Sequence, residues 1–337
     1  MRPPQPFDAV LLISFGGPGA PEDIRPFLAN VLRGRHIPTA RIDGVVHHYE
    51  LFDGLSPITA ITMRQAEGLR RRLASIGLPV YVGMRNWHPF LDDTLKQMSR
   101  DGVRRILALT LAAHHCYSSC GQYKQNVVQA RETIRTDGYD DLEVTYVGGW
   151  HTHAGFIEAI ACQVEAARDT LAAELRASAR VVFTAHSIPS TMAAESRYVA
   201  ELKESATLVA KRLATSNWDL VFQSRSGRPQ DPWLEPDICG YLRTEHAKGL
   251  GAVVVSPLGF VADHIEVLYD LDTEAADVSR KLGLAMGRAS AVNDHSSFLD
   301  MMTDVVETTC RQYARGFPLP IVPTVPPSRT ELPPPVR

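Results

Sequence analysis

Short apolar segments recur along the chain, and stretches with the polar and apolar spacing of amphipathic helices separate them. These segments span residues 9–15, 80–84, 106–111, 144–147, 181–184, 220–222 and 253–255. Continuous rather than alternating hydrophobicity is typical of strands that are covered on both faces. The pattern therefore predicts an α/β protein with parallel sheets and helices on both sides of each sheet.

The alternation of strands and helices occurs twice, once before about residue 150 and once after it. We therefore expect two similar Rossmann-like, doubly wound domains, 1–150 and 151–316, that face a cleft. The last helix of the second domain could pack back on the first. Residues 317–337 are rich in proline and lack an apolar period, which predicts a disordered tail.

Composition restricts the class of protein and its compartment. The 337 residues include 35 Lys and Arg against 38 Asp and Glu, a net charge of −3 that disfavours nucleic acid as a partner. Five cysteines without a regular spacing indicate reduced thiols in a cytoplasmic protein. The start does not resemble a signal peptide, and the longest mostly apolar run, 251–262, is too short to span a membrane.

Ligands of doubly wound sheets bind beyond the carboxyl ends of the strands, so candidate chemistry is sought there. The first strand is followed by Gly16, Gly17, Pro18 and Gly19. Pro18 breaks the spacing of a dinucleotide fingerprint, which favours a tight turn that lets a flat ligand approach the backbone. A nucleotide-binding α/β enzyme remains an alternative.

A second candidate is the polar loop after the 106–111 strand. It contains His114, His115, Cys116 and Cys120, a combination that invites a zinc site. No second Cys or His pair at ligand spacing lies nearby in the sequence. We therefore favour a polar loop that lines the ligand crevice over a structural metal site.

The second half of the chain offers titratable side chains after two strands. His186 directly follows one of them and could serve as a proton acceptor or metal ligand, although a lone histidine is more often structural. After the 253–255 strand, Glu266, Asp270 and Glu274 are spaced four residues apart, which places them on one helix face. Such a row is either a solvated acidic face or a path for protons or cations.

Six segments in sequence order resemble the ferrochelatase family, which inserts ferrous iron into a porphyrin. They are LLISFGGPGAPEDIRPFL near the start, YELFDGLSPI at 49–58, GMRNWHP at 83–89, FTAHSIP at 183–189, FQSRSGRPQDPWLEP at 222–236 and GFVADHIEVLYDLDTE at 259–274. The resemblance covers most of the chain, from about residue 11 to residue 298. The order of the six segments makes the resemblance specific.

The resemblance implies two similar α/β domains and a central pair, His186 and Glu266, that face each other across the porphyrin. A porphyrin loses two pyrrole protons as the metal enters, so a neutral imidazole could act as the base. Imidazole and carboxylate together could also hold Fe²⁺, the substrate, as metal ligands. Asp270 and Glu274 match the family's acidic helix, which has a π-type distortion, and are assigned to a proton or metal path.

The resemblance also implies residues that contact the porphyrin. Ser56 and Tyr123 match contacting positions, and Tyr49, Arg33 and Arg35 lie in segments near the propionates, which need donors. Many Gram-positive members have Tyr where this chain has Phe15, so a protein ligand to iron from that side is in doubt. Trp233 is assigned to the porphyrin site as well, with core packing as the alternative.

Some family members bind a [2Fe–2S] cluster through four cysteines, three of them in a C-terminal extension. No cysteine follows Cys310 here, so we expect no cluster. The chain is most similar to actinobacterial members, which favours coproporphyrin III over protoporphyrin IX as substrate. We expect a monomer that could hand its product to a coproheme decarboxylase; a non-catalytic tetrapyrrole-binding protein is the alternative from another class.

Overall fold

The computed structural model describes residues 5–34, 38–228 and 230–317. The chain divides into two compact units. Unit 1 comprises the described residues of 1–111, 120–148 and 302–337, and unit 2 comprises 112–119 and 149–301. The units therefore differ from the predicted halves of the sequence in two segments. Residues 112–119 belong to unit 2, and the last helix runs from unit 2 into unit 1.

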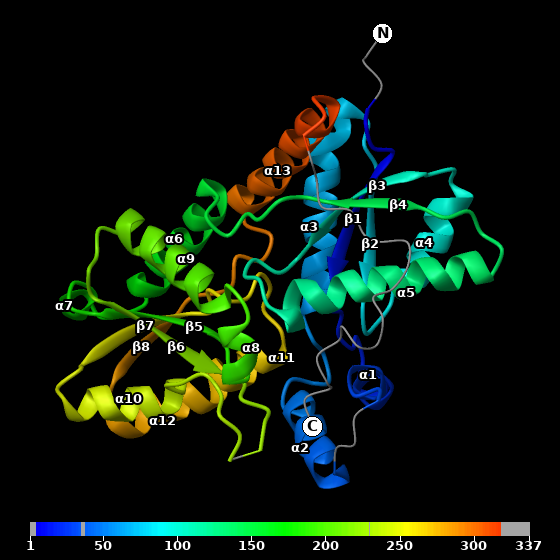
Figure 1. Ribbon diagram of the computed structural model, residues 1–337. Helices are drawn as coiled ribbons and strands as arrows, with labels where there is room; N and C mark the ends of the chain where they lie inside the picture. Colours follow the sequence, from blue (N-terminus) through cyan, green and yellow to red (C-terminus); the bar gives the residue numbers. More distant parts are fainter. Residues whose placement is uncertain (1–4, 35–37, 229, 318–337) are drawn as a thin grey trace. The chain divides into compact units, whose positions relative to one another are not determined.

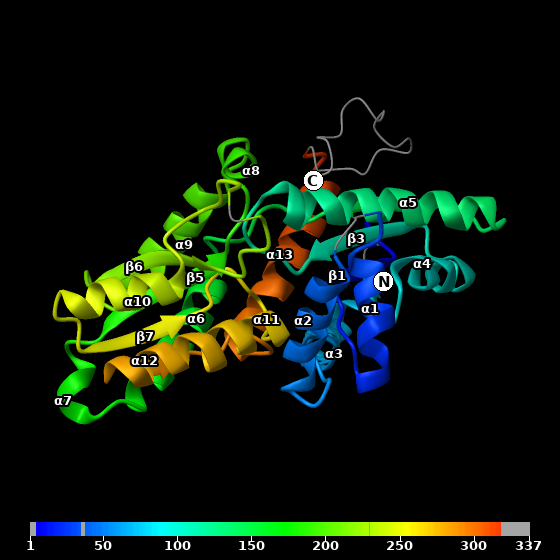
Figure 2. The same cartoon turned by 90° about the horizontal axis from the view of Figure 1, so that it is seen from below.

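Unit 1 contains a four-stranded parallel sheet in the order β2-β1-β3-β4. The strands are β1 (Ala9–Ser14), β2 (Val80–Met84), β3 (Arg105–Thr110) and β4 (Glu143–Tyr146). Its helical segments are η1 (Pro21–Asp23), α1 (Ile24–Val31), α2 (Thr39–Glu50), α3 (Ile58–Leu73), η2 (Ala74–Ile76), α4 (Leu91–Arg100) and α5 (Gln122–Thr136). Figure 2 shows α5 and α3 on opposite sides of this sheet.

The core of unit 1 explains why β1 is apolar on both faces. Leu11 and Ile13 pack with Leu95 of α4 and Val127 of α5 in one buried cluster. The intervening side chains of β1 point to the other face, and all six residues of the strand are buried. The end of β1 is thereby fixed, and with it the position of the residues that follow.

Unit 2 repeats this arrangement with the order β6-β5-β7-β8, again all parallel. The strands are β5 (Arg180–His186), β6 (Trp218–Gln223), β7 (Ala252–Ser256) and β8 (Ala285–Arg288). Its helical segments are α6 (Ala154–Asp169), α7 (Ala173–Arg176), α8 (Ser190–Ala194), α9 (Tyr198–Arg212), α10 (Ile238–Ala247), α11 (Ile265–Val267), η4 (Leu268–Ala275) and α12 (Ala276–Leu282). Figure 1 shows α6 and α9 on one side of the sheet and α10 and α12 on the other.

Two further elements involve both units. The π-helical turn η3 (Tyr117–Gly121) precedes α5 and contains the boundary between residues 119 and 120. Helix α13 (Ser296–Ala314) begins in unit 2 and ends in unit 1. Near its end, the Tyr313 ring lies 4.8 Å from the Phe7 ring between centroids, which anchors the helix beside the start of β1.

The predicted architecture of two parallel, helix-covered sheets is confirmed, and each predicted apolar run coincides with one of β1 to β7. The sequence did not indicate β8, because Ala285–Arg288 is a short edge strand with mixed burial. The predicted disordered tail lies almost wholly outside the described residues. Among the described helices, none is long and apolar enough to cross a membrane.

Candidate functional site

His186 is the last residue of β5, so its side chain leaves the sheet at the carboxyl end of the strand. The Nδ1 atom lies within hydrogen-bond distance of the Ser187 carbonyl, which can only accept. The proton of a neutral ring is therefore on Nδ1, and the Nε2 atom keeps its lone pair. The His186 carbonyl accepts a hydrogen bond of 3.0 Å from the Tyr198 hydroxyl, which holds the backbone beneath the ring.

Glu266 lies beside this histidine because a glycine lets the loop after β7 approach β5 closely. The Gly259 N–H donates to the Thr184 carbonyl at 3.0 Å. A Cβ atom on Gly259 would lie 2.6 Å from the Ala185 Cβ and 2.8 Å from its Cα, so any larger residue would push the loop away. The loop after β7 therefore leads into α11 next to the end of β5, where α11 presents Glu266.

The separation of His186 and Glu266 corrects one expectation. The His186 Nε2 atom is 3.8 Å from the Glu266 Oε2 atom. A flat ring between two side chains needs about 7 Å, two contact distances of about 3.5 Å each. The two residues therefore do not face each other across a porphyrin; they lie together and can act on the same atom. Their side chains are 32% and 59% exposed, so a substrate can reach both.

His264 is a part of this site that the sequence reasoning did not single out. It caps α11, and its Nδ1 atom accepts a hydrogen bond of 3.3 Å from the Val267 N–H. Burial lowers the pKa of His264, so the ring stays neutral with its proton on Nε2. Its position two residues before Glu266, at the start of the acidic row, was the available signal.

Asp270 and Glu274 lie on the π-helical segment η4, as the family resemblance implied, and Glu266 lies on α11 just before it. A π-helix has more residues per turn than an α-helix, so side chains four residues apart come closer to a single line. Burial, helped by the neighbouring Glu266 and Glu274 carboxylates, raises the pKa of Asp270 to about 7, while hydrogen bonds from Ser224 and Gln223 oppose this rise. Burial also raises the pKa of Glu274.

The middle residue of the row is half-buried and held by hydrogen bonds, whereas Glu266 and Glu274 are exposed. The Ser224 backbone has φ of 60°, a left-handed conformation that non-glycine residues rarely adopt, and its hydroxyl donates to the Asp270 Oδ2 atom. The Gln223 amide donates to the same oxygen at 3.2 Å. Asp270 can therefore exchange a proton near neutral pH, which Glu266 and His186 could supply or accept.

Arg288, at the end of β8, fixes the two segments that carry the row. Its guanidinium lies 2.7 Å from the Asp263 Oδ1 atom in the loop before α11 and 3.0 Å from the Asp272 Oδ1 atom on the π-helix. The Asn293 side chain donates to Asp263 at 2.7 Å. This network is partly buried, and no local pattern in the sequence indicates it, since its members are far apart along the chain.

Unit 1 brings together aromatic side chains at the carboxyl end of its sheet. Phe15 follows β1, and Tyr123 lies in the first turn of α5. The Arg85 guanidinium is 5.9 Å from the centroid of each of these rings, a cation–π distance. Burial raises the pKa of Tyr123 to about 12, so its hydroxyl remains protonated.

The glycine turn after β1 packs against the protein rather than leaving an open approach. A Cβ atom on Gly17 would lie 2.7 Å from the Ser56 Cβ and 2.8 Å from the Ile58 Cγ2. The Ser56 N–H donates to the Pro18 carbonyl at 3.0 Å. Ser56 is thus held against the turn, while Tyr49 is buried with its ring centroid 6.0 Å from that of Phe27.

The remaining predicted contact residues lie in separate places. Arg33 is exposed and donates to the Asn30 Oδ1 atom at 2.8 Å. Arg35 lies outside the described residues. Trp233, in unit 2, is half-buried, and Gly227 has no room for a Cβ atom because the Trp233 indole occupies that space. The Trp233 ring is therefore packed against its own loop.

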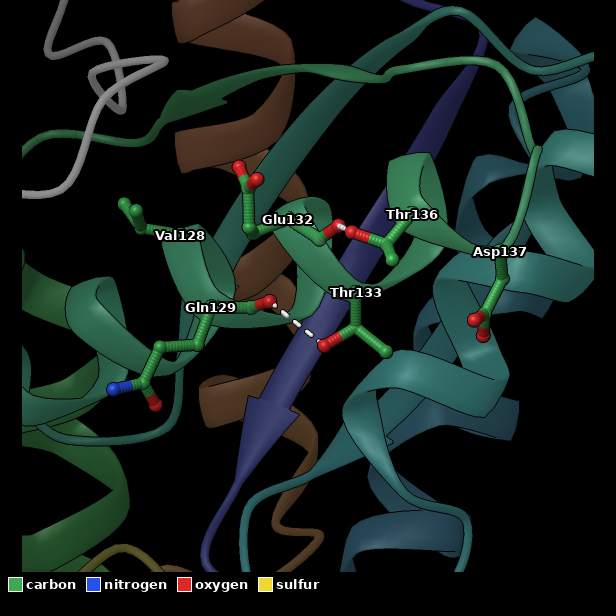
Figure 3. A pocket seen from close by; sticks show the side chains of 6 residues that line it. All are labelled: Val128, Gln129, Glu132, Thr133, Thr136 and Asp137. Carbon is green, nitrogen blue, oxygen red and sulfur yellow. Dashed lines mark hydrogen bonds between the residues drawn. The ribbon is translucent and has the colours of Figure 1, made fainter.

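A hollow along α5 carries no comparable chemistry (Figure 3). Its lining comes from one stretch of that helix and includes Thr133 and Thr136. Their hydroxyls donate to the Gln129 and Glu132 carbonyls at 3.1 and 3.0 Å, so they are satisfied within the helix. The titratable groups instead gather at the carboxyl end of the unit 2 sheet.

Known proteins provide an independent comparison. A ferrochelatase from Rhodopirellula baltica is 45% identical over 305 residues, 90% of this chain and 86% of that protein. A coproporphyrin III ferrochelatase from Streptomyces griseus is 42% identical and covers 91% of this chain and 86% of its own. The solved structure of SirB from Bacillus subtilis with Fe³⁺ has a similar fold, with a TM-score of 0.57 at 11% identity, over 93% of this chain and 99% of that one.

The family assignment rests on the extent of the match. A family model described as "Ferrochelatase" matches residues 7–310, which include both sheets and all of the candidate residues above. The structural likeness to SirB, at low identity, bears on the fold alone. The chain belongs to the ferrochelatase family.

Proposed function

We propose that this ferrochelatase inserts Fe²⁺ into coproporphyrin III and releases two protons, as a step of haem biosynthesis. The observation that carries the proposal is the pairing of His186 and Glu266, 3.8 Å apart at the carboxyl end of β5. The 42% identical Streptomyces griseus relative, a coproporphyrin III ferrochelatase, supports this choice of porphyrin. Protoporphyrin IX is the alternative substrate.

The roles of the central pair follow from their protonation. His186 keeps a lone pair on Nε2, because its Nδ1 proton is directed to the Ser187 carbonyl. We assign to Nε2 the removal of a pyrrole proton or the binding of incoming Fe²⁺. The exposed Glu266 carboxylate supplies a second oxygen ligand or proton acceptor beside it, and imidazole with carboxylate suits ferrous iron.

The acidic row gives the released protons a path. Asp270, with a pKa of about 7, can take a proton at neutral pH and lose it again. Glu274 continues the row one step further along the π-helix. We propose that protons leave, or iron arrives, along Glu266, Asp270 and Glu274, and that the rigid Arg288 network keeps the row aligned with His186.

We assign the binding of the porphyrin to aromatic and polar groups. Phe15, Tyr123 and Ser56 provide apolar surface and hydroxyls in unit 1, and Trp233 provides a flat ring in unit 2. Arg33 and Tyr49 are proposed donors to the propionates, for which a guanidinium and a hydroxyl are suited. Phe15 cannot ligate iron, so no ligand is assigned on that side.

Three finer features complete the proposal. The protein acts in the cytoplasm as a monomer, contains no iron–sulfur cluster, and passes iron coproporphyrin III to a coproheme decarboxylase. The purified chain should therefore lack the visible absorption of a cluster and acid-labile sulfide. Cluster-type absorption together with sulfide would contradict this feature without affecting the metal-insertion reaction.

The choice of substrate is tested by anaerobic assays of the full chain with Fe²⁺ and either coproporphyrin III or protoporphyrin IX, followed through the loss of free-porphyrin fluorescence. We expect kcat/KM to be at least about 10-fold higher with coproporphyrin III, a difference of about 1.4 kcal/mol in transition-state binding. Equal values, or a preference for protoporphyrin IX, would exclude the proposed substrate. Tight binding of either porphyrin without insertion would instead indicate a carrier.

A further inference from the structure

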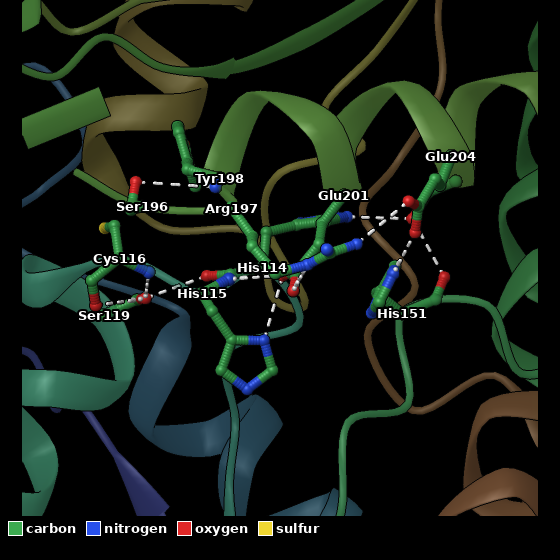
Figure 4. A network of polar contacts seen from close by, with 11 residues as sticks. His114, His115, Cys116, Ser119, His151, Ser196, Arg197, Tyr198, Glu201 and Glu204 are labelled. Atoms are coloured by element: carbon green, nitrogen blue, oxygen red, sulfur yellow. Dashed lines mark hydrogen bonds and ion pairs between the residues drawn. The ribbon is translucent and has the colours of Figure 1, made fainter. Parts of the chain in front are cut away.

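A second group of metal-ligating side chains lies in unit 2, apart from His186 and Glu266. One ligand atom from each of His115, His151 and Glu201 lies within 4.8 Å of the others, the one such group of three that the described residues contain. His115 precedes η3, His151 precedes α6, and Glu201 lies on α9 (Figure 4). All three belong to unit 2, so their proximity is a property of one folded unit.

The protonation of His151 follows from its hydrogen bond. Its Nε2 atom is 2.8 Å from the Glu204 Oε2 atom, and an ionised carboxylate can only accept. The proton of the neutral ring is therefore on Nε2, and Nδ1 keeps a lone pair. That Nδ1 atom is buried and has no hydrogen-bond partner among the described residues. A histidine that donates one N–H to a carboxylate and keeps the other nitrogen free is typical of metal sites.

His114 adds a second buried nitrogen of the same kind. The Ser205 hydroxyl donates its one proton to the His151 carbonyl at 2.8 Å, so the His114 Nε2 atom, 2.9 Å from Ser205 Oγ, must be the donor in that contact. The His114 Nδ1 atom is then unprotonated, buried and without a partner among the described residues. The centroids of the His114 and His151 rings are 6.2 Å apart. Two buried lone pairs without donors are costly unless a ligand satisfies them.

Glu201 brings a negative charge to this region. Its side chain is 5% exposed, and its Oε2 atom accepts from the His115 N–H at 2.7 Å and lies 2.9 Å from the His115 Nδ1 atom. Arg197 pairs with this carboxylate, with its Nε atom 3.5 Å from Glu201 Oε1, and also with Glu204 at 3.1 Å, but its side chain is 68% exposed. A metal ion beside the imidazole nitrogens can pair more closely with this buried carboxylate than the exposed Arg197 guanidinium does.

We propose that His115, His151 and Glu201 form a second binding site for a divalent first-row metal ion, separate from the site of porphyrin metallation. Two imidazole nitrogens and one carboxylate, with positions left open, are the ligand set of non-haem Fe²⁺ sites and of many zinc sites. Cys116 and Cys120, whose spacing first pointed to zinc, are not in this group of three.

To bind a metal ion, the three ligand atoms must move slightly closer together. Metal–ligand bonds of 2.0–2.1 Å place tetrahedral ligand atoms about 3.3 Å apart, less than the 4.8 Å limit observed. The His115 side chain, 42% exposed, has room to rotate. Its Nδ1 proton moves to the outer nitrogen or to solvent when the metal binds, and Arg197 turns into solvent, so no buried charge is left unpaired.

The site is joined to His186 through α9. Tyr198, three residues before Glu201, donates its hydroxyl proton to the His186 carbonyl at 3.0 Å. A metal ion bound to Glu201 would therefore hold the first turn of α9 against the 112–119 segment. This places a metal-dependent constraint on the helix that supports His186, without any contact between the two metal sites.

The test uses the full chain with His186→Ala and Glu266→Gln, which removes the central pair, and needs no porphyrin. Anaerobic Fe²⁺ and Zn²⁺ are titrated by calorimetry, and Co²⁺ by its visible absorption. We expect about one ion per chain, at least about 10-fold weaker binding after His115→Ala, and about 10-fold to 100-fold weaker binding after Glu204→Gln. The control His47→Ala, which alters an exposed His–Glu pair on α2, leaves the affinity unchanged.

Arg197→Ala separates a metal site from a hydrogen-bond network. Removal of the competing guanidinium should tighten metal binding, whereas a network without a metal site predicts no binding to tighten. Binding of about one equivalent of Fe²⁺ or of Zn²⁺ per chain supports the site and identifies the metal ion that occupies it. The proposal is overturned if the parent variant binds none of the three metals, or if His115→Ala leaves the affinity unchanged.

Discussion

Strands β1 and β5 hold the same place in their sheets, second in the orders β2-β1-β3-β4 and β6-β5-β7-β8. The chain that leaves β1 presents Phe15, whose ring lies 5.9 Å from the Arg85 guanidinium. The chain that leaves β5 presents His186, whose Nε2 atom lies 3.8 Å from Glu266. Because ligands bind beyond the carboxyl ends of parallel strands, one position offers an aromatic surface and the other offers a base.

The third strands of the two sheets, β3 and β7, show the same difference between the units. The loop after β7 leads to Glu266 and the π-helix in unit 2, whereas the loop after β3, with His114 and His115, leaves unit 1 and packs within unit 2. Unit 2 therefore collects the titratable groups, and unit 1 keeps buried aromatic rings and hydroxyls. In the proposed reaction, proton and metal chemistry should depend on unit 2, and porphyrin affinity on unit 1.

Among variants outside the central pair, the largest expected effect comes from Gly259→Ala. The new Cβ atom would meet Ala185 and displace the loop that presents Glu266 to His186. A displacement of about 1 Å at a reacting group can cost about 10²-fold, so we expect kcat to fall by about that factor while porphyrin binding changes little. Steady-state kinetics and fluorescence titration measure the two quantities.

Gly251→Ala is the matched control for that variant, since Gly251 directly precedes β7 and nothing lies within 4 Å of an added Cβ atom. Its kcat should remain close to that of the parent. Gly17→Ala makes the corresponding change in unit 1, where Ser56 blocks the Cβ atom, and should raise KM more than it lowers kcat. If Gly17→Ala and Gly259→Ala changed kcat and KM in the same way, the assignment of metal chemistry to unit 2 and of porphyrin affinity to unit 1 would be wrong.

The next effect is on stability. The Asp270 pKa is raised to about 7, so the folded protein binds this proton more tightly than the unfolded chain does, and ionisation destabilises the fold as pH rises. The wild type should therefore lose about 2 kcal/mol relative to Asp270→Asn between pH 5 and pH 7. Urea unfolding at both pH values measures the difference.

Asp277→Asn, at an exposed position on α12 ion-paired with Arg280, serves as the control for the stability measurement. Its free energy of unfolding should differ from that of the wild type by a similar amount at both pH values. A stability difference between wild type and Asp270→Asn that does not change with pH would show that Asp270 is ionised throughout.

A smaller effect is expected on the pH–rate profile. If Asp270 accepts a proton as a carboxylate, kcat should rise through a pKa of about 7, and Asp270→Asn should lack that rise and be about 10-fold slower above it. Measurements from pH 5.5 to 8.5 with coproporphyrin III resolve the step. An unaltered profile in the variant would remove Asp270 from the proton path.

Tyr123→Phe should have the smallest effect. The Tyr123 hydroxyl, with a pKa of about 12, stays protonated and cannot take part in proton removal. Loss of one hydrogen bond to a bound porphyrin is worth about 1 kcal/mol, so KM should rise about fivefold at unchanged kcat. A large fall in kcat, with KM unchanged, would assign chemistry to unit 1.

The sequence predicted those parts of the fold and site that are local. Apolar runs marked β1 to β7, and the residues after β5 and β7 drew attention to His186 and Glu266. The mixed edge strand β8 and its Arg288 were missed, because their role depends on Asp263 and Asp272, which only folding brings near. The arrangement of His186 and Glu266 on the two sides of a ring, which was taken from the family resemblance, was wrong, because their side chains lie 3.8 Å apart.

The His115 group shows the same limit. The spacing of Cys116 and Cys120 drew attention to this loop, but neither cysteine belongs to the group of three. The histidine and carboxylate that complete the group come from positions 151 and 201, in two other segments of the chain. No local pattern connects them, and the tautomers that leave Nδ1 of His114 and His151 without a partner among the described residues depend on hydrogen bonds formed after folding.

The most direct test of the division between the units is a single-turnover experiment on His186→Ala with Fe²⁺ and coproporphyrin III, in which porphyrin binding and metal insertion are measured separately. Because removal of a general base typically costs about 10²-fold to 10⁴-fold, we predict an insertion rate lower by at least about 100-fold. The porphyrin Kd should stay within about threefold of the wild-type value, since a His186 hydrogen bond to the porphyrin is not required. An insertion rate within about tenfold of wild type, or a parallel loss of binding and insertion, would contradict the central role of His186.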